Sequence, residues 1–316
     1  MKLKLKDQKI LITGGAGFIG SNLTDYFLEN DNEVTVIDDF STGILKNLEN
    51  AKKSKNFFLI RGDIRDETKL KKIIQDVDYI FHQAAIASVP LSIKDPVKTN
   101  DVNVNGTLNI LHLAKNSDIK RIVFASSSSV YGEVKTLPIK EDDIVGPISP
   151  YGVSKLSAES YLLMYQKVFG VKVTILRYFN VYGKRQIDSP YSGVIPIWFG
   201  KLLRNESPVI FGDGFQRRDF IYIRDIIQLN ELAAIKKVAI GEIFNAGISV
   251  ACSINELAEL VIEVVGKKID LIYEPIRNGD IKDSIASISK ANKLLDYKPN
   301  YDLKKGLMEL YKSNFS

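Results

Sequence analysis

The fold of this chain is decided by the sequence ILITGGAGFIG at residues 10–20. The apolar run at 10–12 predicts a β-strand, and the apolar spacing over 18–28 predicts a helix, so the glycines between them form a tight turn. Gly15, Gly17 and Gly20 fit the pattern Gly-x-Gly-x-x-Gly. In this pattern the first glycine permits the turn, the second lets the backbone approach a pyrophosphate, and the third lets the helix pack on the strand. The N–H groups and dipole of the helix start would favour the pyrophosphate.

An acidic residue strengthens this interpretation. A second apolar run, residues 34–37, ends in Asp38. A carboxylate at this point of a dinucleotide site accepts a hydrogen bond from the adenosine ribose 2′-OH. Together the turn and Asp38 predict an NAD site, because a carboxylate would repel the 2′-phosphate of NADP. The alternative is a strand that ends in a solvated aspartate turn.

The composition is that of an ordinary folded protein. The 316 residues suffice for one large domain or two unequal ones. Hydrophobic residues at 45% and charged residues at 26% exclude disordered and fibrous classes. The net charge of +5 suits anionic small molecules but is too diffuse to indicate nucleic acid.

The cysteine and histidine content limits the chemistry. One cysteine, Cys252, excludes an internal disulfide, and with only His82 and His112 beside it we expect no metal site. A reducing cytoplasm is therefore expected. The sequence has no apolar signal segment at its start and no run of 18 apolar residues, so we expect no membrane partner.

Strand-like and helix-like segments alternate along residues 10–176. Strands are also predicted at 57–60, 79–81, 121–125 and 173–176, and helices at 66–74, 97–114 and 151–169. This alternation predicts an α/β fold with a doubly wound parallel sheet and ligands at the carboxyl ends of its strands. We predict a Rossmann NAD-binding domain over 1–178, with a return strand at 241–248, and a smaller α/β substrate domain over 179–316.

Two groups of polar residues are candidates for an active site. Four serines, 126–129, come directly after the strand at 121–125, and Tyr151 and Lys155 share one helix face. Elsewhere a serine run is a linker, and a Tyr-x-x-x-Lys pair is common on helix surfaces. The position of the serines at a strand's carboxyl end favours the edge of an active site.

Taken together, these residues resemble the extended short-chain dehydrogenase/reductase family, and within it the UDP-hexose 4-epimerases. The resemblance runs over essentially the whole chain. Its motifs are TGGAGFIG at 13–20, NVNGT at 103–107, YGVSK at 151–155, RYFN at 177–180, GDG at 212–214, RDF at 218–220 and RNGD at 277–280.

The resemblance implies a tightly bound NAD, a UDP-sugar substrate and a set of site residues. Tyr151 would be the catalytic acid and base, Lys155 would bind the nicotinamide ribose and lower the tyrosine pKa, and Ser127 would hold the sugar O4. The implied cofactor contacts are Gly14, Gly15, Gly17, Phe18, Ile19, Gly20, Asp38, Asp39, Ser41, Gly43, Asp63, Ile64, Gln83, Ala84, Ala85, Ala87, Asn103, Tyr151, Lys155 and Phe179. The implied substrate contacts are Ser88, Ser127, Ser128, Tyr151, Asn180, Gly193, Val194, Val209, Arg218, Arg277, Asp280 and Ser284. Among them, Asp63 and Ile64 would contact adenine, and Asn180, Arg218 and Arg277 the diphosphate.

The implied reaction is 4-epimerisation through a 4-keto sugar. It needs a base near neutral pH, and a nearby Lys⁺ and the nicotinamide cation could lower a tyrosine pKa by ~1 to 3 units. Related dehydratases carry Thr-Asp-Glu at 127–129, and related decarboxylases carry Glu at 129, whereas this chain has only serines there. A UDP-glucuronate 4-epimerase or decarboxylase, or a catalytically silent NAD-binding regulator, remain alternatives.

Substrate choice and assembly are also expected from the resemblance. In the family a tyrosine at the position of Ser284 restricts the enzyme to UDP-glucose and UDP-galactose. Ser284 and Gly193 are small here, which predicts room for an N-acetyl group at C2. The less favoured alternative is that Ser284 is an exposed serine without a role. Such a pocket would still accept the smaller sugars. The helices at 97–114 and 151–169 would pair in a homodimer.

Three positions depart from the family pattern. Lys184 replaces a usual proline, Asp296 replaces a usual glycine, and Asp39 replaces a common asparagine. The first two changes are expected to affect loops only. Asp39 adds negative charge beside the ribose and further opposes NADP.

Overall fold

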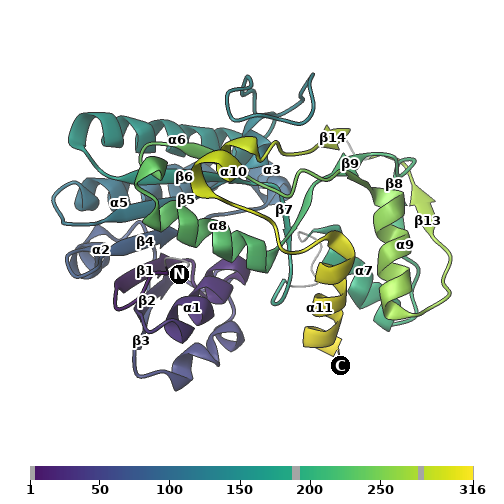
Figure 1. The fold of residues 1–316 in the computed structure, drawn as a ribbon, viewed down its shortest axis with the longest axis horizontal. Coiled ribbons are helices and arrows are strands. Elements are labelled where there is room, and N and C mark those ends of the chain that lie inside the picture. The colour runs from purple at the N-terminus through teal and green to yellow at the C-terminus, as the bar shows by residue number, and fades with distance from the viewer. Residues whose placement is uncertain (1–3, 187–192, 277–280, 316) are drawn as a thin grey trace.

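A seven-stranded parallel sheet forms the larger part of the molecule (Figure 1). The computed structural model describes residues 4–186, 193–276 and 281–315. The strand order is β11-β6-β5-β4-β1-β2-β3. The strands are β1 (Lys9–Thr13), β2 (Glu33–Asp38), β3 (Phe57–Arg61), β4 (Tyr79–His82), β5 (Arg121–Ser127), β6 (Val173–Tyr178) and β11 (Ile243–Ala246). The order reverses between β1 and β4, which is where a doubly wound sheet binds ligands. The predicted fold class is confirmed.

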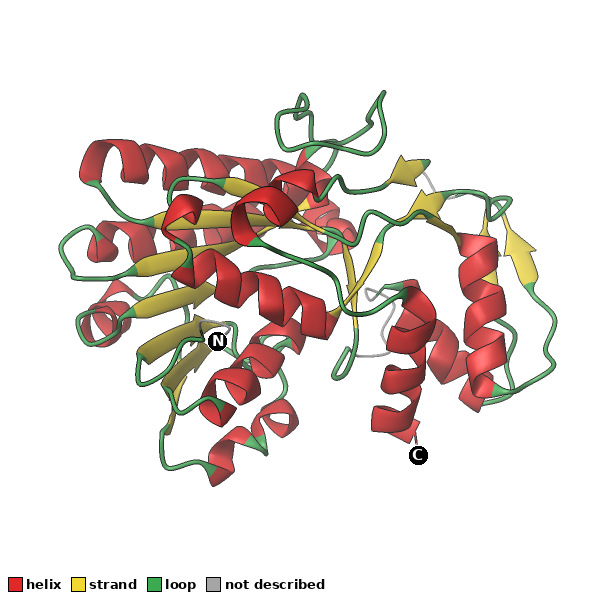
Figure 2. Cartoon of the chain, viewed as in Figure 1, coloured by secondary structure: helices red, strands yellow, loops and turns green. Residues whose placement is uncertain are grey.

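Helices cover both faces of this sheet (Figure 2). They are α1 (Phe18–Glu29), α2 (Glu67–Ile74), α5 (Gly106–Ala114), α6 (Pro150–Phe169) and α8 (Ile223–Ile235). Alternate side chains of one strand point to opposite faces. Ile10 and Ile12 therefore join a core with α1 and α8, whereas Leu11 joins a second core with α2, α5 and α6.

The helix predicted over 97–114 is not continuous. It consists of α4 (Pro96–Asn100), a π-helical turn η3 (Asp101–Asn105) and α5. A short helix that was not predicted, α3 (Val89–Lys94), precedes it. Ser88 and Asp95 cap the starts of α3 and α4, accepting hydrogen bonds from the N–H groups of Leu91 and Lys98. Each helix also carries a proline in its first turn, where a missing N–H costs nothing.

The smaller part lies beside the carboxyl ends of the sheet (Figure 1). It contains three short sheets, β10-β7, β12-β9-β14 and β13-β8. Its strands are β7 (Asn180–Tyr182), β8 (Val209–Phe211), β9 (Arg217–Arg218), β10 (Phe220–Tyr222), β12 (Cys252–Ser253), β13 (Ile272–Glu274) and β14 (Asp283–Ser284). Its helices are α7 (Val194–Leu203), α9 (Ile254–Val265) and α11 (Leu303–Phe315), while α10 (Ser289–Leu295) contacts β11. Because α8 and β11 pack with the large sheet, the chain crosses between the two parts more than once.

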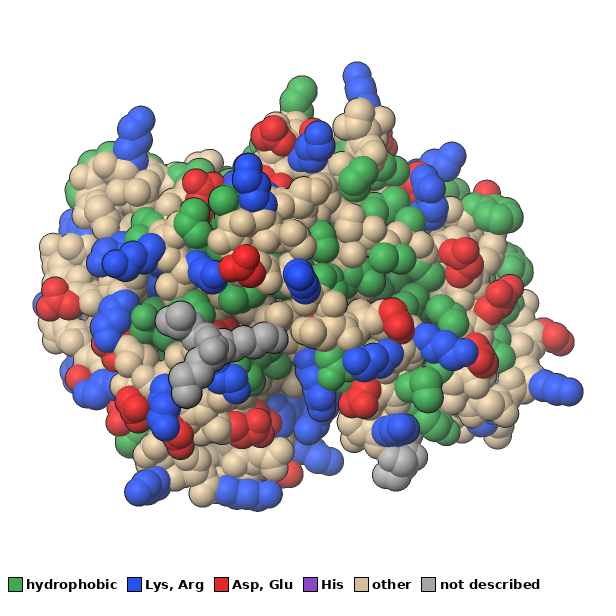
Figure 3. Space-filling model, viewed as in Figure 1, with side chains coloured by type: hydrophobic (Ala, Val, Ile, Leu, Met, Phe, Trp, Pro, Cys, Tyr) green, Lys and Arg blue, Asp and Glu red, His purple; other side chains and the backbone are tan. Residues whose placement is uncertain are grey.

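Two further observations concern the charge of the surface and the length of the helices. Lysine and arginine side chains are interspersed with aspartate and glutamate on the face shown in Figure 3. Within the described ranges, no helix is long and apolar enough to cross a membrane.

Candidate active site

A cavity of about 1490 Å³ opens between the two parts, at the carboxyl ends of the parallel strands. Sites for one small ligand are usually ~300–1,000 Å³, so this cavity has room for two. All predicted site residues that the structure describes line it, except Gly15, Gly43, Asn103 and Ser284. Arg277 and Asp280 lie outside the described residues.

The glycine turn packs as the motif requires, with one correction. The residue with left-handed backbone is Gly14 (φ +67°), not the first glycine of the motif, Gly15. A Cβ on Gly15 would lie 2.5 Å from a methyl of Val36, and one on Gly20 would collide with the carbonyl oxygen of Gly14. Gly15 and Gly20 therefore serve strand and helix packing. Gly17 begins α1 without a side-chain cap, which leaves the helix start suited to a pyrophosphate.

The predicted ribose acid is fixed in one orientation. Asp38 accepts hydrogen bonds from the backbone N–H groups of Ala16 and Phe40, each at 2.8 Å. Burial raises its pKa, while these two N–H groups oppose the rise. Gly43 lies outside the cavity but packs on this carboxylate, because a Cβ there would come within 2.7 Å of Asp38 Oδ1. The turn and Asp38 together fit the adenosine half of NAD.

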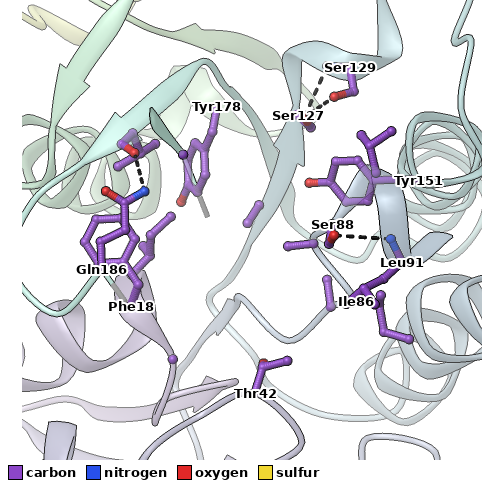
Figure 4. A pocket seen from close by; sticks show the side chains of 18 of the residues that line it. Phe18, Thr42, Ile86, Ser88, Leu91, Ser127, Ser129, Tyr151, Tyr178 and Gln186 are labelled. Carbon is purple, nitrogen blue, oxygen red and sulfur yellow. Dashed lines mark hydrogen bonds between the residues drawn. The ribbon is translucent and has the colours of Figure 1, made fainter. Parts of the chain in front are cut away.

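The three predicted catalytic residues line one cavity. Figure 4 shows two of them, Ser127 and Tyr151, on the same wall. Helix α6 starts where Ser149 accepts a hydrogen bond from the Gly152 N–H at 3.1 Å. Tyr151 and Lys155 then face the carboxyl end of β5. Lys155 Nζ donates to the Ala125 carbonyl at 2.7 Å and lies 6.0 Å from the centre of the Tyr151 ring.

The serines next to this pair form their own hydrogen bonds. Ser127 Oγ accepts from the Ser129 N–H and donates to Ser129 Oγ, each at 3.1 Å. The side chains of Ser127 and Tyr151 lie next to each other on this wall (Figure 4). Ser127, Ser128 and Ser129 all line the cavity, and none of them is a carboxylate.

Burial shifts both titrating groups toward their neutral forms. It raises the pKa of Tyr151, and the neighbouring Ser127 side chain opposes this rise. It lowers the pKa of Lys155 to about 7, opposed by the charge of Glu159. Burial and Ser127 therefore act in opposite directions on the pKa of Tyr151.

A buried ion pair supports this wall and was not predicted. Arg177 donates two hydrogen bonds to Glu159, from Nη2 to Oε2 at 2.7 Å and from Nε to Oε1 at 3.0 Å. Ser126 donates to the same carboxylate. Glu159 follows Lys155 by one helical turn, and this spacing of four residues is the signal by which it could have been found.

Two further polar residues hold the cavity wall from behind. Asn103 exchanges hydrogen bonds with the backbone of Ile86, at 2.8 and 3.1 Å, and donates to Ser154 Oγ at 2.9 Å. His82 lies between the hydroxyls of Thr13 and Thr107 at 2.7 and 2.9 Å. Burial lowers the pKa of His82 to about 3, so this imidazole is neutral.

The opposite wall comes from the smaller part. Asn180, Gly193, Val194, Val209 and Arg218 line the cavity there. Tyr178 and Gln186 also point into this region, although neither was predicted as a site residue (Figure 4).

Ser284 does not reach the cavity wall formed by the described residues. It is buried on β14, beside Arg218 of β9. The next residue along, Asp219, accepts N–H groups from Ile248, Ser249 and Ala286, and burial raises its pKa to about 6. Ser284 is thus neither exposed nor in contact with the described cavity.

Metal chemistry has no candidate residues in the described ranges. No group of three or more histidine, cysteine, aspartate or glutamate side chains is placed to hold a metal ion there.

Comparison with known proteins gives the family. The sequence model of the "NAD dependent epimerase/dehydratase family" matches residues 10–247. A UDP-glucose 4-epimerase of Mycolicibacterium smegmatis is 34% identical over 302 residues, which cover 95% of this chain and 96% of that protein.

Two solved structures are similar over nearly the whole chain. A UDP-N-acetylglucosamine 4-epimerase from Methanobrevibacter ruminantium, in complex with UDP-N-acetylmuramic acid, has 42% identity, 98% coverage of both chains and a TM-score of 0.93. A UDP-glucuronic acid 4-epimerase from Bacillus cereus, in complex with UDP-glucuronic acid and NAD, has 37% identity, coverage of 96% of this chain and 98% of that one, and a TM-score of 0.90. The chain therefore belongs to the NAD-dependent epimerase/dehydratase family, and NAD is its cofactor.

Proposed function

We propose that this protein interconverts UDP-N-acetylglucosamine and UDP-N-acetylgalactosamine, and also UDP-glucose and UDP-galactose, by epimerisation at C4. The observation that carries this proposal is the convergence of Ser127, Tyr151 and Lys155 beside two further serines. A base and a hydroxyl are present for reversible oxidation of an alcohol, but no carboxylate from 127–129 is available to eliminate water.

Each residue has a defined role in this proposal. NAD, held at the glycine turn and Asp38, would supply the hydride acceptor and donor for C4 of the sugar. Tyr151 accepts the O4 proton as the 4-keto sugar forms and gives it back when O4 is restored. Ser127, held by the Ser129 N–H, hydrogen-bonds to the same oxygen. Lys155 is held by its hydrogen bond to the Ala125 carbonyl. In its protonated form, the lysine stabilises the negative charge of the Tyr151 tyrosinate.

Acceptance of an N-acetyl group is supported by the open wall at Gly193. Among the residues that the structure describes, a Cβ added to Gly193 meets only the flexible end of Gln186, at 3.4 Å. Val194 and Ala87 add small apolar surface to the same cavity. The similarity to a UDP-N-acetylglucosamine 4-epimerase points the same way. Ser284 does not contribute to this argument.

We also propose a homodimer formed through α4 and α6. Four α6 side chains at helical spacing, Val153, Tyr161, Met164 and Val168, are 38–62% exposed, and Val97 of the adjacent α4 is 79% exposed. An apolar stripe of this kind is typical of a helix that packs against a partner. Sedimentation that gave a mass near the 35.4 kDa of one chain would contradict the dimer. The cytoplasmic location stays a prediction.

The decisive experiment uses purified protein without added NAD. It is incubated separately with UDP-N-acetylglucosamine, UDP-glucose and UDP-glucuronate, and the anomeric signals are followed by proton NMR. Formation of UDP-N-acetylgalactosamine and UDP-galactose is expected, with NAD retained from expression. Conversion of UDP-glucose alone would refute the N-acetyl assignment, and galacturonate or pentose product would favour a glucuronate enzyme. No turnover of any sugar would favour a silent NAD-binding protein.

A further inference from the structure

The adenine end of the cavity lies between two segments that are far apart in sequence. One rim is the loop after β3, with Asp63, Ile64 and Arg65. The other rim is formed by α4 and the π-helical turn η3, with Lys98 and Val102. Both rims line the same cavity as the ribose acid and the glycine turn. A ligand that occupies this end therefore lies against both rims.

One side chain, Arg65, joins these two rims. Its Nε lies 3.0 and 3.1 Å from the two carboxylate oxygens of Asp63, and its Nη2 lies 2.6 Å from Asp63 Oδ2. Its Nη1 donates across the gap to Asp101 Oδ2 at 2.5 Å. The backbone N–H of Arg65 also donates to Asp63 Oδ1, at 2.8 Å. Both oxygens of Asp63 are thus held from the Arg65 side.

The π-helical turn explains why Asp101 is available for this contact. A π turn holds an extra residue, so side chains on it point in directions that a regular helix would not offer. Asp101 begins the turn and reaches Arg65, while its Oδ1 accepts a hydrogen bond from Asn105 at 2.9 Å. Asn103, on the same turn, holds the Ile86 backbone. The turn therefore ties the β3 loop to the loop after β4.

We propose that Arg65 is a positioning residue for the adenine of NAD: it fixes the Asp63 carboxylate to accept the adenine amino group, and it ties the two rims together so that the cofactor leaves slowly. The proposal concerns the cofactor, so it does not depend on which sugar the enzyme converts.

The chemistry of Asp63 makes this recognition selective. The hydrogen bonds from Arg65 lower the pKa of Asp63, and those from Arg65 and Asn105 lower that of Asp101. Both carboxylates are ionised at neutral pH and accept hydrogen bonds only. An amino group at C6 of the purine donates to such a carboxylate, whereas a carbonyl oxygen at that position is repelled by it.

The geometry also makes this ion pair stronger than an ordinary surface pair. Arg65 is 37% exposed, Asp63 29% and Asp101 41%, and a single pair at such exposure contributes little. Arg65 forms a bidentate interaction with Asp63 and a further hydrogen bond with Asp101, and together these bonds fix the orientation of its guanidinium group. These bonds oppose separation of the two rims, and through this resistance Arg65 slows the release of NAD in our proposal.

The first test measures the release of NAD from the holoenzyme after addition of excess ADP-ribose. Arg65→Ala is expected to release NAD about tenfold faster than the unchanged protein. Asp101→Asn, which keeps the fork to Asp63, is expected to accelerate release about threefold. Arg204→Ala removes another exposed arginine–carboxylate fork, to Glu206, and serves as the matched control with unchanged release. An unchanged release rate in Arg65→Ala would overturn the proposal.

The second test separates positioning of Asp63 from simple closure of the rims. Holoenzyme is mixed with either NAD or nicotinamide hypoxanthine dinucleotide, which carries a carbonyl in place of the amino group, and the exchange of bound cofactor is measured. The unchanged protein and Arg204→Ala are expected to prefer NAD about tenfold, and Arg65→Ala to lose most of that preference. Equal preference in Arg65→Ala and the unchanged protein would refute a role in positioning Asp63.

Discussion

Replacing Lys155 by methionine should change how the stability of the fold depends on pH. Lys155 is 3% exposed, and burial lowers its pKa from 10.5 to about 7. The unfolded chain keeps the ordinary value. Between pH 7 and 10.5 the unfolded chain therefore holds a proton at this position that the folded chain has lost. Because the unfolded state binds more protons, the free energy of unfolding rises with pH across this window and is flat below it.

The size of this change in unfolding free energy depends on how many pH units above 7 are measured. Each unit between pH 7 and pH 9 adds about 1.4 kcal/mol, so Lys155 contributes about 3 kcal/mol more to stability at pH 9 than at pH 6. Methionine has a similar volume and does not titrate. The difference in unfolding free energy between the unchanged protein and Lys155→Met should therefore grow by about 3 kcal/mol over this range.

Urea unfolding, followed by circular dichroism at pH 6, 7.5 and 9 on protein freed of NAD, measures this difference without a contribution from ligand binding. At pH 6, Lys155→Met should be at least as stable as the unchanged protein, because it buries no charge. Lys167→Met, at an exposed position of the same helix, is the matched control for loss of a lysine. A difference between Lys155→Met and the unchanged protein that stays constant from pH 6 to 9 would refute the lowered pKa of Lys155.

Three other substitutions test the remaining parts of the site. Tyr151→Phe keeps the ring but removes the hydroxyl, so it should abolish nearly all sugar turnover in the NMR assay and leave NAD bound; an undiminished rate would contradict its role. Arg177→Met leaves Glu159 buried without its partner and should destabilise the fold by about 3–5 kcal/mol in urea unfolding, whereas a loss below about 1 kcal/mol would show that the carboxylate finds other compensation. Gly20→Ala places a methyl group against the Gly14 carbonyl, so protein purified with this change should carry less than about a tenth of the usual NAD, and full occupancy would disprove the packing argument.

The sheet and the cofactor site could be predicted because their signals are local. Ile10, Leu11 and Ile12 are apolar in succession because both faces of β1 are covered by helices. Gly17 and Gly20 are required by contacts within the turn, and Gly15 by Val36 on the adjacent β2. Gly14 is required by its left-handed backbone and by the approach of Ala84 after β4. Asp38 is the last residue of β2, so its position was predictable from the end of the apolar run. Each of these features depends on a short stretch of sequence, so hydrophobic periodicity and turn residues are enough to predict it.

Features that depend on tertiary contacts could not be predicted in the same way. The π-helical turn at Asp101 has no local signature, and its partner Arg65 lies 36 residues earlier. Ser284 was expected on the cavity wall, but the pairing of β14 with β9 buries it elsewhere. Asp296 replaces a usual glycine at the end of α10 and keeps the left-handed backbone (φ +58°) that glycine would favour. Its carboxylate pairs with Lys236 at 2.6 Å, which helps to offset the strain.

The charges around Lys155 predict opposite effects for two changes to the same ion pair. Glu159 opposes the fall in the pKa of Lys155, and Arg177 partly neutralises Glu159. Glu159→Gln removes the anion and leaves the cation, so the pKa of Lys155 should fall below about 7 and the rise of stability with pH should begin earlier. Arg177→Met removes the cation and leaves the anion, so that pKa should increase and the rise should begin later. Combining each change with Lys155→Met, and repeating the urea series, isolates the lysine. If both changes moved the onset in the same direction, the pair would act on Lys155 through packing alone and not through its charges.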